Sequence, residues 1–313
     1  MQAWSIINPP EGSTERPTVD VSNIRRKYFD IPYASQSPSQ KLDIYLPGEG
    51  EGPFPTLIFI HGGAFVFGDK RDLQFLHAID GINRGYAVVS VEYRRAFEAQ
   101  YPNPLFDIKA AIRFLRANAA TYNLDGNRFA SGGDSVGGYY VVMAASTQGN
   151  PAFEDFSMGN AEYSSKVKAI ISWYGAFDVT ARGKDKDIEN TDLKDSELPD
   201  SDKLPDIYKL WLGAQMGEIS GLMHFTNPLH FITPEFPPVF VQHGSDDRTV
   251  PVIHAYQLEE QVRKICGEGY ATVDILDGYD HGTSGPRFQF MDPKWVNKEQ
   301  VDKAFTFLDK HLK

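Results

Sequence analysis

Short runs of apolar, β-branched and aromatic residues alternate with stretches of helical periodicity along this 313-residue chain. Such alternation is typical of strand-helix-strand units that build a mostly parallel sheet with helices on both faces. The runs predict eight strands, near residues 27–33, 41–46, 56–60, 87–93, 128–131, 169–173, 239–242 and 272–276. The pattern therefore predicts an α/β fold built on one eight-stranded sheet.

Helical periodicity is clearest where Ile108, Ile112, Leu115 and Ala119 recur at spacings of four, three and four residues. This spacing puts the four side chains on one face of a helix, which we expect to lie on the sheet. Similar patterns predict four more helices, near residues 71–84, 136–147, 254–266 and 297–312.

One segment, residues 177–226, breaks the alternation and reads as an insertion. Its first part holds ten Asp or Glu residues between positions 178 and 206, which is usual for a solvated loop. Its second part is rich in large apolar side chains, namely Tyr208, Trp211, Met216, Met223 and Phe225. Such a composition favours either a lid over a cleft or ordinary packing. We expect one domain, residues 1–313, with the insertion inside it.

Composition narrows the classes of protein. The chain is 41% hydrophobic and 13% aromatic, so it can bury a large core, and its net charge of −11 argues against a nucleic-acid partner. Cys266 is the only cysteine, which excludes an intrachain disulfide and a Cys-pair redox or zinc-ribbon site. The chain shows neither a basic-then-apolar N-terminus nor an 18-residue apolar stretch. We therefore expect a cytoplasmic protein with no membrane contact, and a homo-oligomer is compatible with the sequence.

A candidate nucleophile lies in Gly133-Asp134-Ser135-Val136-Gly137, which matches the G-x-S-x-G nucleophile elbow. The glycines allow a tight turn that lifts the serine hydroxyl out of the sheet. The bare pattern is weak evidence, but here a predicted strand precedes it and a small-residue-rich helix follows it, as the motif requires. We predict that Ser135 is the nucleophile.

Ser135 needs a base and an acid, which follow such an elbow in the order acid, then histidine. Among the eight histidines, His281 fits best, because it follows the last predicted strand in a glycine-flanked loop. A surface-loop histidine would be the ordinary interpretation without the elbow. The acid is expected on the turn after the strand at 239–242, where Asp247 is the choice and Asp246 the reserve.

An oxyanion needs backbone N–H donors beside the serine. The His61-Gly62-Gly63-Ala64-Phe65 turn follows the strand at 56–60, where such donors are expected, although its glycines could simply make a tight turn. The amide of Val136, the residue after the nucleophile, is the second expected donor.

Together these motifs resemble the hormone-sensitive-lipase-like branch of the α/β-hydrolases, which includes bifunctional feruloyl and acetyl-xylan esterases. The likeness extends over residues 41–47, the His61-Gly62-Gly63 turn, residues 106–115, the elbow, Asn227-Pro228-Leu229 and His281. The resemblance implies the α/β-hydrolase fold with a small lid-like insertion. It also implies a Ser135, Asp247, His281 triad and an oxyanion hole from the amides of Gly63, Ala64 and Val136.

The resemblance implies a carboxylesterase that acts on short acyl (acetyl) or cinnamoyl (feruloyl) esters. The expected substrate is a small-molecule or oligosaccharide ester, and esters of plant cell-wall carbohydrate are among the candidates. No cofactor and no metal are expected, since the chain has no H-E-x-x-H or G-x-G-x-x-G motif. Two departures from the family bear on the acyl pocket, namely Val136 in place of alanine and the long acidic insertion. An arylformamidase or serine peptidase of the same fold remains an alternative, and a non-enzymatic ligand-binding protein is the alternative of another class.

Overall fold

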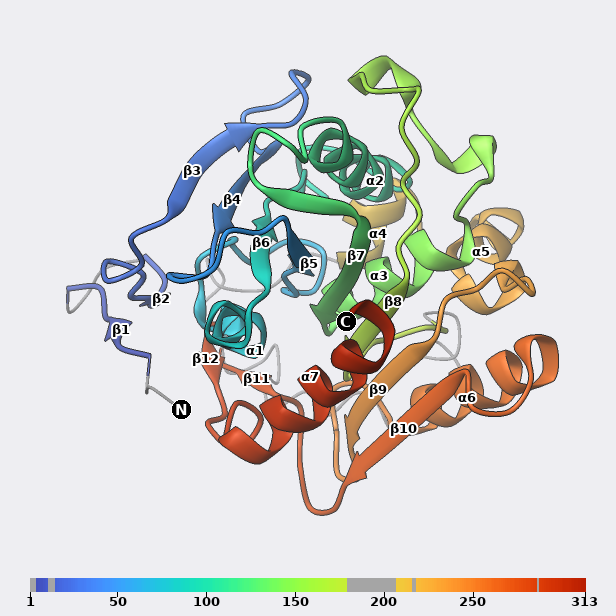
Figure 1. Ribbon diagram of the computed structural model, residues 1–313. Helices are drawn as coiled ribbons and strands as arrows, with labels where there is room; N and C mark the ends of the chain where they lie inside the picture. The colour runs from blue at the N-terminus through green and yellow to red at the C-terminus, as the bar shows by residue number, and fades with distance from the viewer. Residues whose placement is uncertain (1–3, 11–14, 179–206, 216–217, 286) are drawn as a thin grey trace.

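The computed structural model describes residues 4–10, 15–178, 207–215, 218–285 and 287–313. Its main sheet contains β3 (Lys27–Pro32), β4 (Lys41–Tyr45), β5 (Phe54–Ile60), β6 (Ala87–Val91), β7 (Leu124–Asp134), β8 (Ala169–Trp173), β9 (Val239–Gly244) and β10 (Ala271–Leu276). The spatial order of these eight strands is β10-β9-β8-β7-β5-β6-β4-β3 (Figure 1). In this sheet β4 pairs antiparallel with both β3 and β6, and the other five pairings are parallel. The predicted eight-stranded, mostly parallel sheet of an α/β-hydrolase is confirmed.

Strand β7 is longer than the predicted 128–131, and it contains an irregularity. Leu124 pairs with Phe54 and Phe129 pairs with Thr56, so β7 uses five steps where β5 uses two. The additional residues, 125–127, are Asp, Gly and Asn, which favour turns in a sequence pattern. Strand pairing on both sides of the bulge overrides that local preference.

The helices are α1 (Leu76–Ile79), α2 (Asn103–Ala117), α3 (Val136–Ser146), α4 (Ile207–Leu212), α5 (Ser220–Thr226), α6 (Ile253–Cys266) and α7 (Lys298–Leu312). The predicted bounds of α3, α6 and α7 agree within one residue. Helix α2 begins before Ile108, the first residue of the predicted apolar face, and ends before Ala119, the last one. Short 3₁₀ segments and two small hairpin-like sheets, β1 (Ile6–Ile7) with β2 (Thr18–Val19) and β11 (Thr283–Ser284) with β12 (Phe290–Met291), complete the described elements.

The helix expected near 71–84 is present from Leu73 to Arg84, but most of it is not α-helical. The segment is a 3₁₀ turn (Leu73–Phe75), the short α1 and a second 3₁₀ turn (Asp80–Arg84). Its polar residues Asp72 and Gln74 are buried, and both accept hydrogen bonds from backbone amides of the preceding segment, at Asp69 and Gly62. These contacts with the loop after β5 fix the segment in an irregular path that helical periodicity does not reveal.

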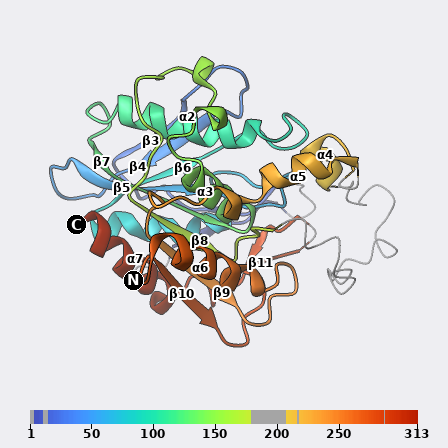
Figure 2. The ribbon, with the colours of Figure 1, turned by 90° about the vertical axis from the view of Figure 1, so that its right-hand side faces the viewer.

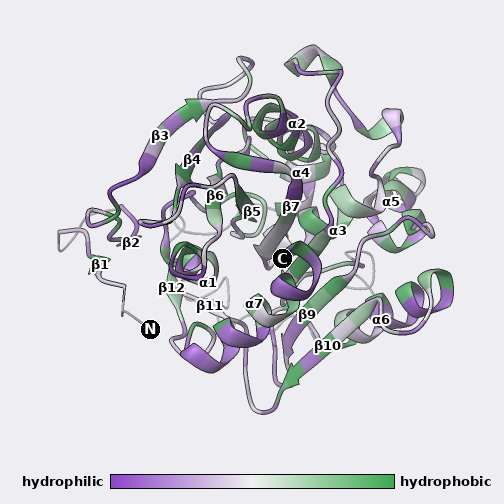
Figure 3. Ribbon diagram, viewed as in Figure 1, coloured by the Kyte–Doolittle hydropathy of each residue, from purple (hydrophilic) through white to green (hydrophobic). Residues whose placement is uncertain are grey.

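Two apolar layers enclose the sheet. One core lies between the sheet and helices α2, α3 and α6, and the other lies between the sheet and helices α1 and α7. Figure 2 shows α2 and α7 on opposite sides of the sheet. In Figure 3 hydrophobic and hydrophilic residues alternate along α7, as an amphipathic helix on a sheet requires. The carboxyl ends of β5, β7, β8, β9 and β10 therefore meet at one edge, where loops can converge.

The insertion is only partly described, because residues 179–206 and 216–217 lie outside the described ranges. Most of the acidic stretch and Met216 therefore lie outside the described residues. In the apolar part, Trp211 is fully buried and Met223 is buried, whereas 49% of Phe225 is exposed. Trp211 thus belongs to the core, and the single-domain division with its insertion stays a prediction. None of the described helices is long and apolar enough to cross a membrane.

Candidate active site

Ser135 stands on the turn between β7 and α3, at the carboxyl edge of the sheet. Its φ of 49° is in the left-handed region, which is strained for a residue with a side chain. The turn packs tightly on β5, since a Cβ on Gly137 would overlap the carbonyl oxygen of Ile60. A Cβ on Gly133 would lie 2.5 Å from the Gly137 carbonyl carbon. Both motif glycines are thus required for the turn to close.

The structure brings Ser135, His281 and Asp247 into one hydrogen-bonded row. The Ser135 hydroxyl donates to His281 Nε2 over 3.1 Å, and His281 Nδ1 donates to Asp247 Oδ2 over 2.8 Å. Exposed fractions are 8% for Ser135, 7% for Asp247 and 6% for His281. The distances are those of a nucleophile, a general base and an orienting acid. This row can pass the serine proton to the imidazole while the carboxylate balances the charge.

Asp247 is held as a carboxylate. Burial raises its pKa, but His281 and His243 outweigh that effect, and the pKa lies well below the usual range. Its other oxygen, Oδ1, accepts the backbone N–H groups of Thr249 over 2.9 Å and Val250 over 2.7 Å. These bonds aim Oδ2 at the imidazole. The reserve candidate Asp246 is exposed and accepts the Ser245 hydroxyl instead, away from the row.

His243, which chain order excludes as the base, supports the acid. Its Nε2 donates to the Val250 carbonyl over 2.8 Å and lies 3.4 Å from Asp247 Oδ2. The ring is fully buried at the end of β9. Sequence reasoning missed this role, although the position of His243 four residues before the acid was a usable signal.

The turn after β5 presents unused backbone donors. Gly63, Ala64 and Phe65 all have positive φ, at 116°, 50° and 67°. The Val66 and Phe67 amides donate to the Gly63 carbonyl over 3.1 and 2.7 Å, which closes the turn. Within the described parts of the chain, no hydrogen bond occupies the amides of Gly63, Ala64 or Val136. These three N–H groups are therefore free to stabilise an oxyanion beside Ser135.

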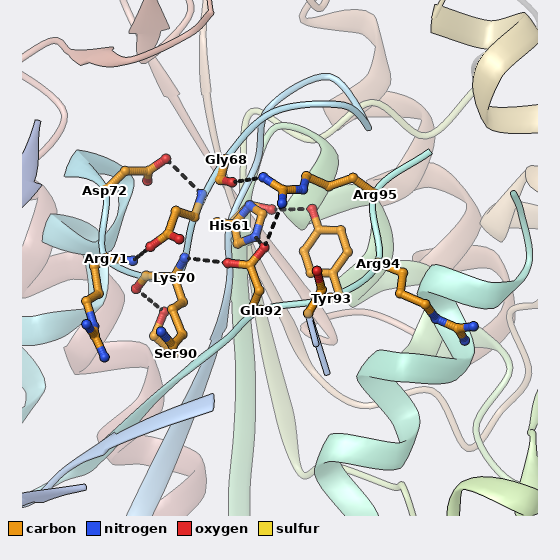
Figure 4. A network of polar contacts seen from close by, with 12 residues as sticks. His61, Gly68, Lys70, Arg71, Asp72, Ser90, Glu92, Tyr93, Arg94 and Arg95 are labelled. Carbon is orange, nitrogen blue, oxygen red and sulfur yellow. Dashed lines mark hydrogen bonds and ion pairs between the residues drawn. The ribbon is translucent and has the colours of Figure 1, made fainter. Parts of the chain in front are cut away.

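A buried polar network holds this turn from behind (Figure 4). His61 Nδ1 donates to the Gly62 carbonyl over 2.8 Å, and the Tyr93 hydroxyl donates to the His61 carbonyl over 2.8 Å. Glu92 Oε1 lies 3.7 Å from His61 Nε2, and Glu92 Oε2 accepts the Lys70 N–H. A trans peptide points its N–H away from its carbonyl oxygen, so fixing the Gly62 carbonyl also fixes the direction of the Gly63 N–H. The sequence placed His61 at the start of the oxyanion turn but did not reveal this contact.

The loop that carries His281 is fixed by its neighbours. Tyr174, directly after β8, packs edge-on against the His281 ring with centroids 4.7 Å apart. Asp280 Oδ1 accepts the N–H groups of both Arg248 and His281, over 3.0 and 2.8 Å. Asp280 therefore ties the histidine loop to the acid loop, a link between segments 32 residues apart that no local pattern announces.

An aromatic cluster covers the outer side of the oxyanion turn. Phe65 stacks on Trp211 with centroids 4.1 Å apart, and Tyr139 meets Trp211 edge-on. The Trp211 indole N–H donates to the Tyr140 hydroxyl over 3.0 Å. Because Trp211 belongs to the insertion, this contact couples the insertion to the turn that carries Ala64.

The described residues offer no group of three His, Cys, Asp or Glu side chains arranged to hold a metal ion. The chemistry above uses only side chains and backbone amides of the chain itself. The expectation of no metal and no cofactor stays a prediction.

Comparisons with known proteins agree with the fold and the motifs. A sequence model of the BD-FAE family matches residues 42–262. Esterase LipC of Mycobacterium tuberculosis is 26% identical over 251 residues, which is 78% of this chain and 57% of LipC. The isoprenylcysteine alpha-carbonyl methylesterase ICME of Arabidopsis thaliana is 24% identical over 71% of this chain and 49% of its own. The chain spans about half the length of the curated relatives it matches.

Solved structures show the same fold. A truncated carbohydrate esterase from gut microbiota superposes with a TM-score of 0.74 at 22% identity, covering 93% of this chain and 98% of that one. The protein named bifunctional GH43-CE, from Bacteroides eggerthii, gives a TM-score of 0.73 at 25% identity over 92% of this chain and 35% of its own. The predicted resemblance is confirmed, and the chain, which has the α/β-hydrolase fold, belongs to the BD-FAE family.

Proposed function

We propose that this protein is a serine carboxylic ester hydrolase that works through an acyl-Ser135 intermediate. One observation carries the proposal. The Ser135 hydroxyl donates to a histidine over 3.1 Å, and three backbone amides beside it have no acceptor among the described residues. The names of relatives such as esterase LipC support the same reaction class.

In the first half of the reaction His281 Nε2 removes the proton from Ser135 as its oxygen attacks the ester carbonyl. Negative charge moves to the former carbonyl oxygen, where the amides of Gly63, Ala64 and Val136 donate to it. The protonated imidazole is stabilised by Asp247, whose lowered pKa keeps it ionised. His281 then gives the proton to the leaving alcohol, and the acyl group stays on Ser135.

In the second half a water molecule takes the place of the alcohol. His281 removes a proton from this water, the hydroxide attacks the acyl carbonyl, and the same three amides receive the charge. The Ser135 oxygen leaves with the proton from His281, and a carboxylic acid is released. The chain supplies every group in this cycle, so no cofactor is required.

The substrate class that we propose is short acyl esters, acetyl above all, or cinnamoyl esters such as feruloyl, carried by carbohydrate. Membership of the BD-FAE family supports this choice, and so does the fold shared with a protein named carbohydrate esterase. A plant cell-wall oligosaccharide is the substrate that combines both ester types.

The test compares the wild type with Ser135→Ala and with Ser146→Ala, a matched change of another buried serine at the far end of α3. We expect a fluorophosphonate probe to label the wild type and Ser146→Ala but not Ser135→Ala. Hydrolysis of p-nitrophenyl acetate, acetylated xylo-oligosaccharides and methyl ferulate should follow the same order. Ser135→Ala should keep less than about one hundredth of wild-type turnover. Labelling of Ser135→Ala, or turnover above that level with intact circular dichroism, would overturn the proposal.

A further inference from the structure

Asp134, the residue before the nucleophile, is a buried carboxyl group that the proposed mechanism does not use. Its exposed fraction is 0%. Its Oδ1 accepts the Gly62 N–H over 2.9 Å, so it joins the elbow to the turn after β5. Its Oδ2 is buried and lacks a hydrogen bond of ordinary geometry among the described residues, and the Tyr174 hydroxyl is the polar side chain that interacts with the carboxyl group. A carboxylate with one oxygen in this state would lack much of its solvation.

The groups that face Asp134 come from four elements. They are Asp72 before the first 3₁₀ turn, His61 after β5, Tyr93 after β6 and Tyr174 after β8. Burial raises the pKa of Asp72, and its ion pair with Arg16, at 2.8 Å, opposes that shift by favouring the carboxylate form. Burial lowers the pKa of His61, but Glu92 and Asp72 outweigh burial and the net shift is upward.

These surroundings favour a neutral Asp134. Burial raises the pKa of Asp134 to about 8, and the negative charge of Asp72 adds to the effect, while the Gly62 N–H and His61 oppose it. Near neutral pH the carboxyl group therefore carries a proton, and it loses that proton in mildly alkaline solution.

Asp134 also lies close to the place where charge develops. A methyl group built on Gly62 would be 2.8 Å from Asp134 Oδ2 and 3.1 Å from Ser135 Cβ, so the carboxyl oxygen is within about 6 Å of that carbon. The next residues of the turn, Gly63 and Ala64, supply the unused amides. A negative charge on Asp134 would thus oppose the oxyanion that those amides stabilise.

We propose that Asp134 is a positioning residue whose neutral form is required for turnover, because it holds the Gly62 amide without placing a negative charge beside the oxyanion. This inference rests on the proposed serine mechanism. Release of the Asp134 proton to solvent then switches the site off in alkaline solution.

The experiment measures kcat/KM between about pH 6 and pH 9.5 for the wild type, Asp134→Asn and Asp72→Asn, with Ser135→Ala as the blank for spontaneous hydrolysis. The wild type should fall by about 10- to 100-fold on the alkaline side, as expected for two unit charges roughly 6 to 9 Å apart at an effective dielectric constant of about 20. Asparagine keeps the acceptor for Gly62 but cannot ionise, so Asp134→Asn should change by less than about threefold between pH 7 and 9.5. Asp72→Asn removes a neighbouring negative charge, so its fall should begin at lower pH than in the wild type.

Three results would each overturn the inference: no alkaline fall in the wild type, an unchanged fall in Asp134→Asn, or a fall in Asp72→Asn that is not displaced to lower pH. Thermal melts at each pH identify losses that come from unfolding, and the wild-type profile remains a test if a variant does not fold. Failure of the proposed function is distinct, because Ser135→Ala would then keep its turnover whatever the pH profile of Asp134→Asn.

Discussion

Replacing Asp247 with asparagine should reverse the proton pattern of the catalytic row. Two backbone amides, of Thr249 and Val250, donate to Asp247 Oδ1, so the asparagine oxygen must occupy that position. The amide NH₂ then takes the position of Oδ2 and faces His281 Nδ1, which lies 2.8 Å from Oδ2 in the wild type. A donor at this point forces Nδ1 to accept, and the imidazole proton moves to Nε2.

An imidazole with its proton on Nε2 cannot remove the Ser135 proton. We therefore expect kcat to fall by about 10⁴, or about 5.4 kcal/mol of transition-state stabilisation. The fold should persist, because asparagine fills the same space and keeps the bonds to both backbone amides. KM should change little, since Asp247 does not contact substrate in this mechanism.

The assay is steady-state hydrolysis of p-nitrophenyl acetate by the wild type, Asp247→Asn and Asp246→Asn. Asp246 is a matched control, because it is the adjacent carboxylate, is exposed and accepts only the Ser245 hydroxyl. Its replacement should cost less than about threefold, as surface changes away from a site usually do. If Asp246→Asn proves the more damaging change, or if Asp247→Asn keeps more than about a tenth of wild-type kcat, the acid has been assigned to the wrong residue.

Three further predictions follow from the site and its supports. Val136→Ala should raise kcat/KM for butanoyl esters relative to acetyl esters. Acetyl turnover should stay within about tenfold of the wild type, because the backbone amide remains and loss of an oxyanion donor would cost roughly 10² to 10³. If the dependence of kcat/KM on acyl chain length does not change, another part of the pocket limits the acyl length. Trp211→Ala removes the fully buried ring stacked on Phe65, so it should lower the free energy of unfolding by about 3–5 kcal/mol and also lower kcat/KM. Trp211→Phe should retain most of the stability, measured by urea titration, and most of kcat/KM. The pKa of Asp134 in the folded state, about 8, exceeds the ordinary value of about 4, so the wild type loses stability as the pH rises from 4 to 8. The melting temperature of Asp134→Asn minus that of the wild type should therefore increase from about pH 5 to 8 and remain constant at higher pH. A difference that is the same at every pH would contradict a neutral buried acid.

Much of the fold follows from periodicity in the chain. Central strands such as residues 87–91 and 169–173 are buried on both faces, so they are continuous apolar runs with little ambiguity. Helices α3, α6 and α7 were predictable for a related reason, since each carries its own local signals of an apolar face or small residues. The helix near 71–84 was predictable in position but not in its mixed 3₁₀ and α geometry, because Gln74 accepts a hydrogen bond from the Gly62 amide of the loop after β5, a contact that periodicity does not reveal.

The candidate site divides in the same way. The elbow around Ser135 and the double-glycine turn after His61 are local signals, each set by the steric needs of one short segment, whereas Asp247 and His281 were found from their order along the chain after the elbow. The aromatic cover of the oxyanion turn by Trp211 is not local, because Phe65 and Trp211 meet only when the insertion folds back on the sheet edge.

The sequence by itself thus determined the fold class, the family and the residues proposed for the chemistry, because strand periodicity and glycine sterics are properties of neighbouring residues and motif order can be read along the chain. The tertiary structure decided the support: His243 beside Asp247, Asp280 between two loops, and Asp134 against Gly62. The charge state of a buried carboxyl group such as Asp134 depends on its distance from water and from other charges. Chain segments that are distant in sequence set both quantities, and only folding brings them together.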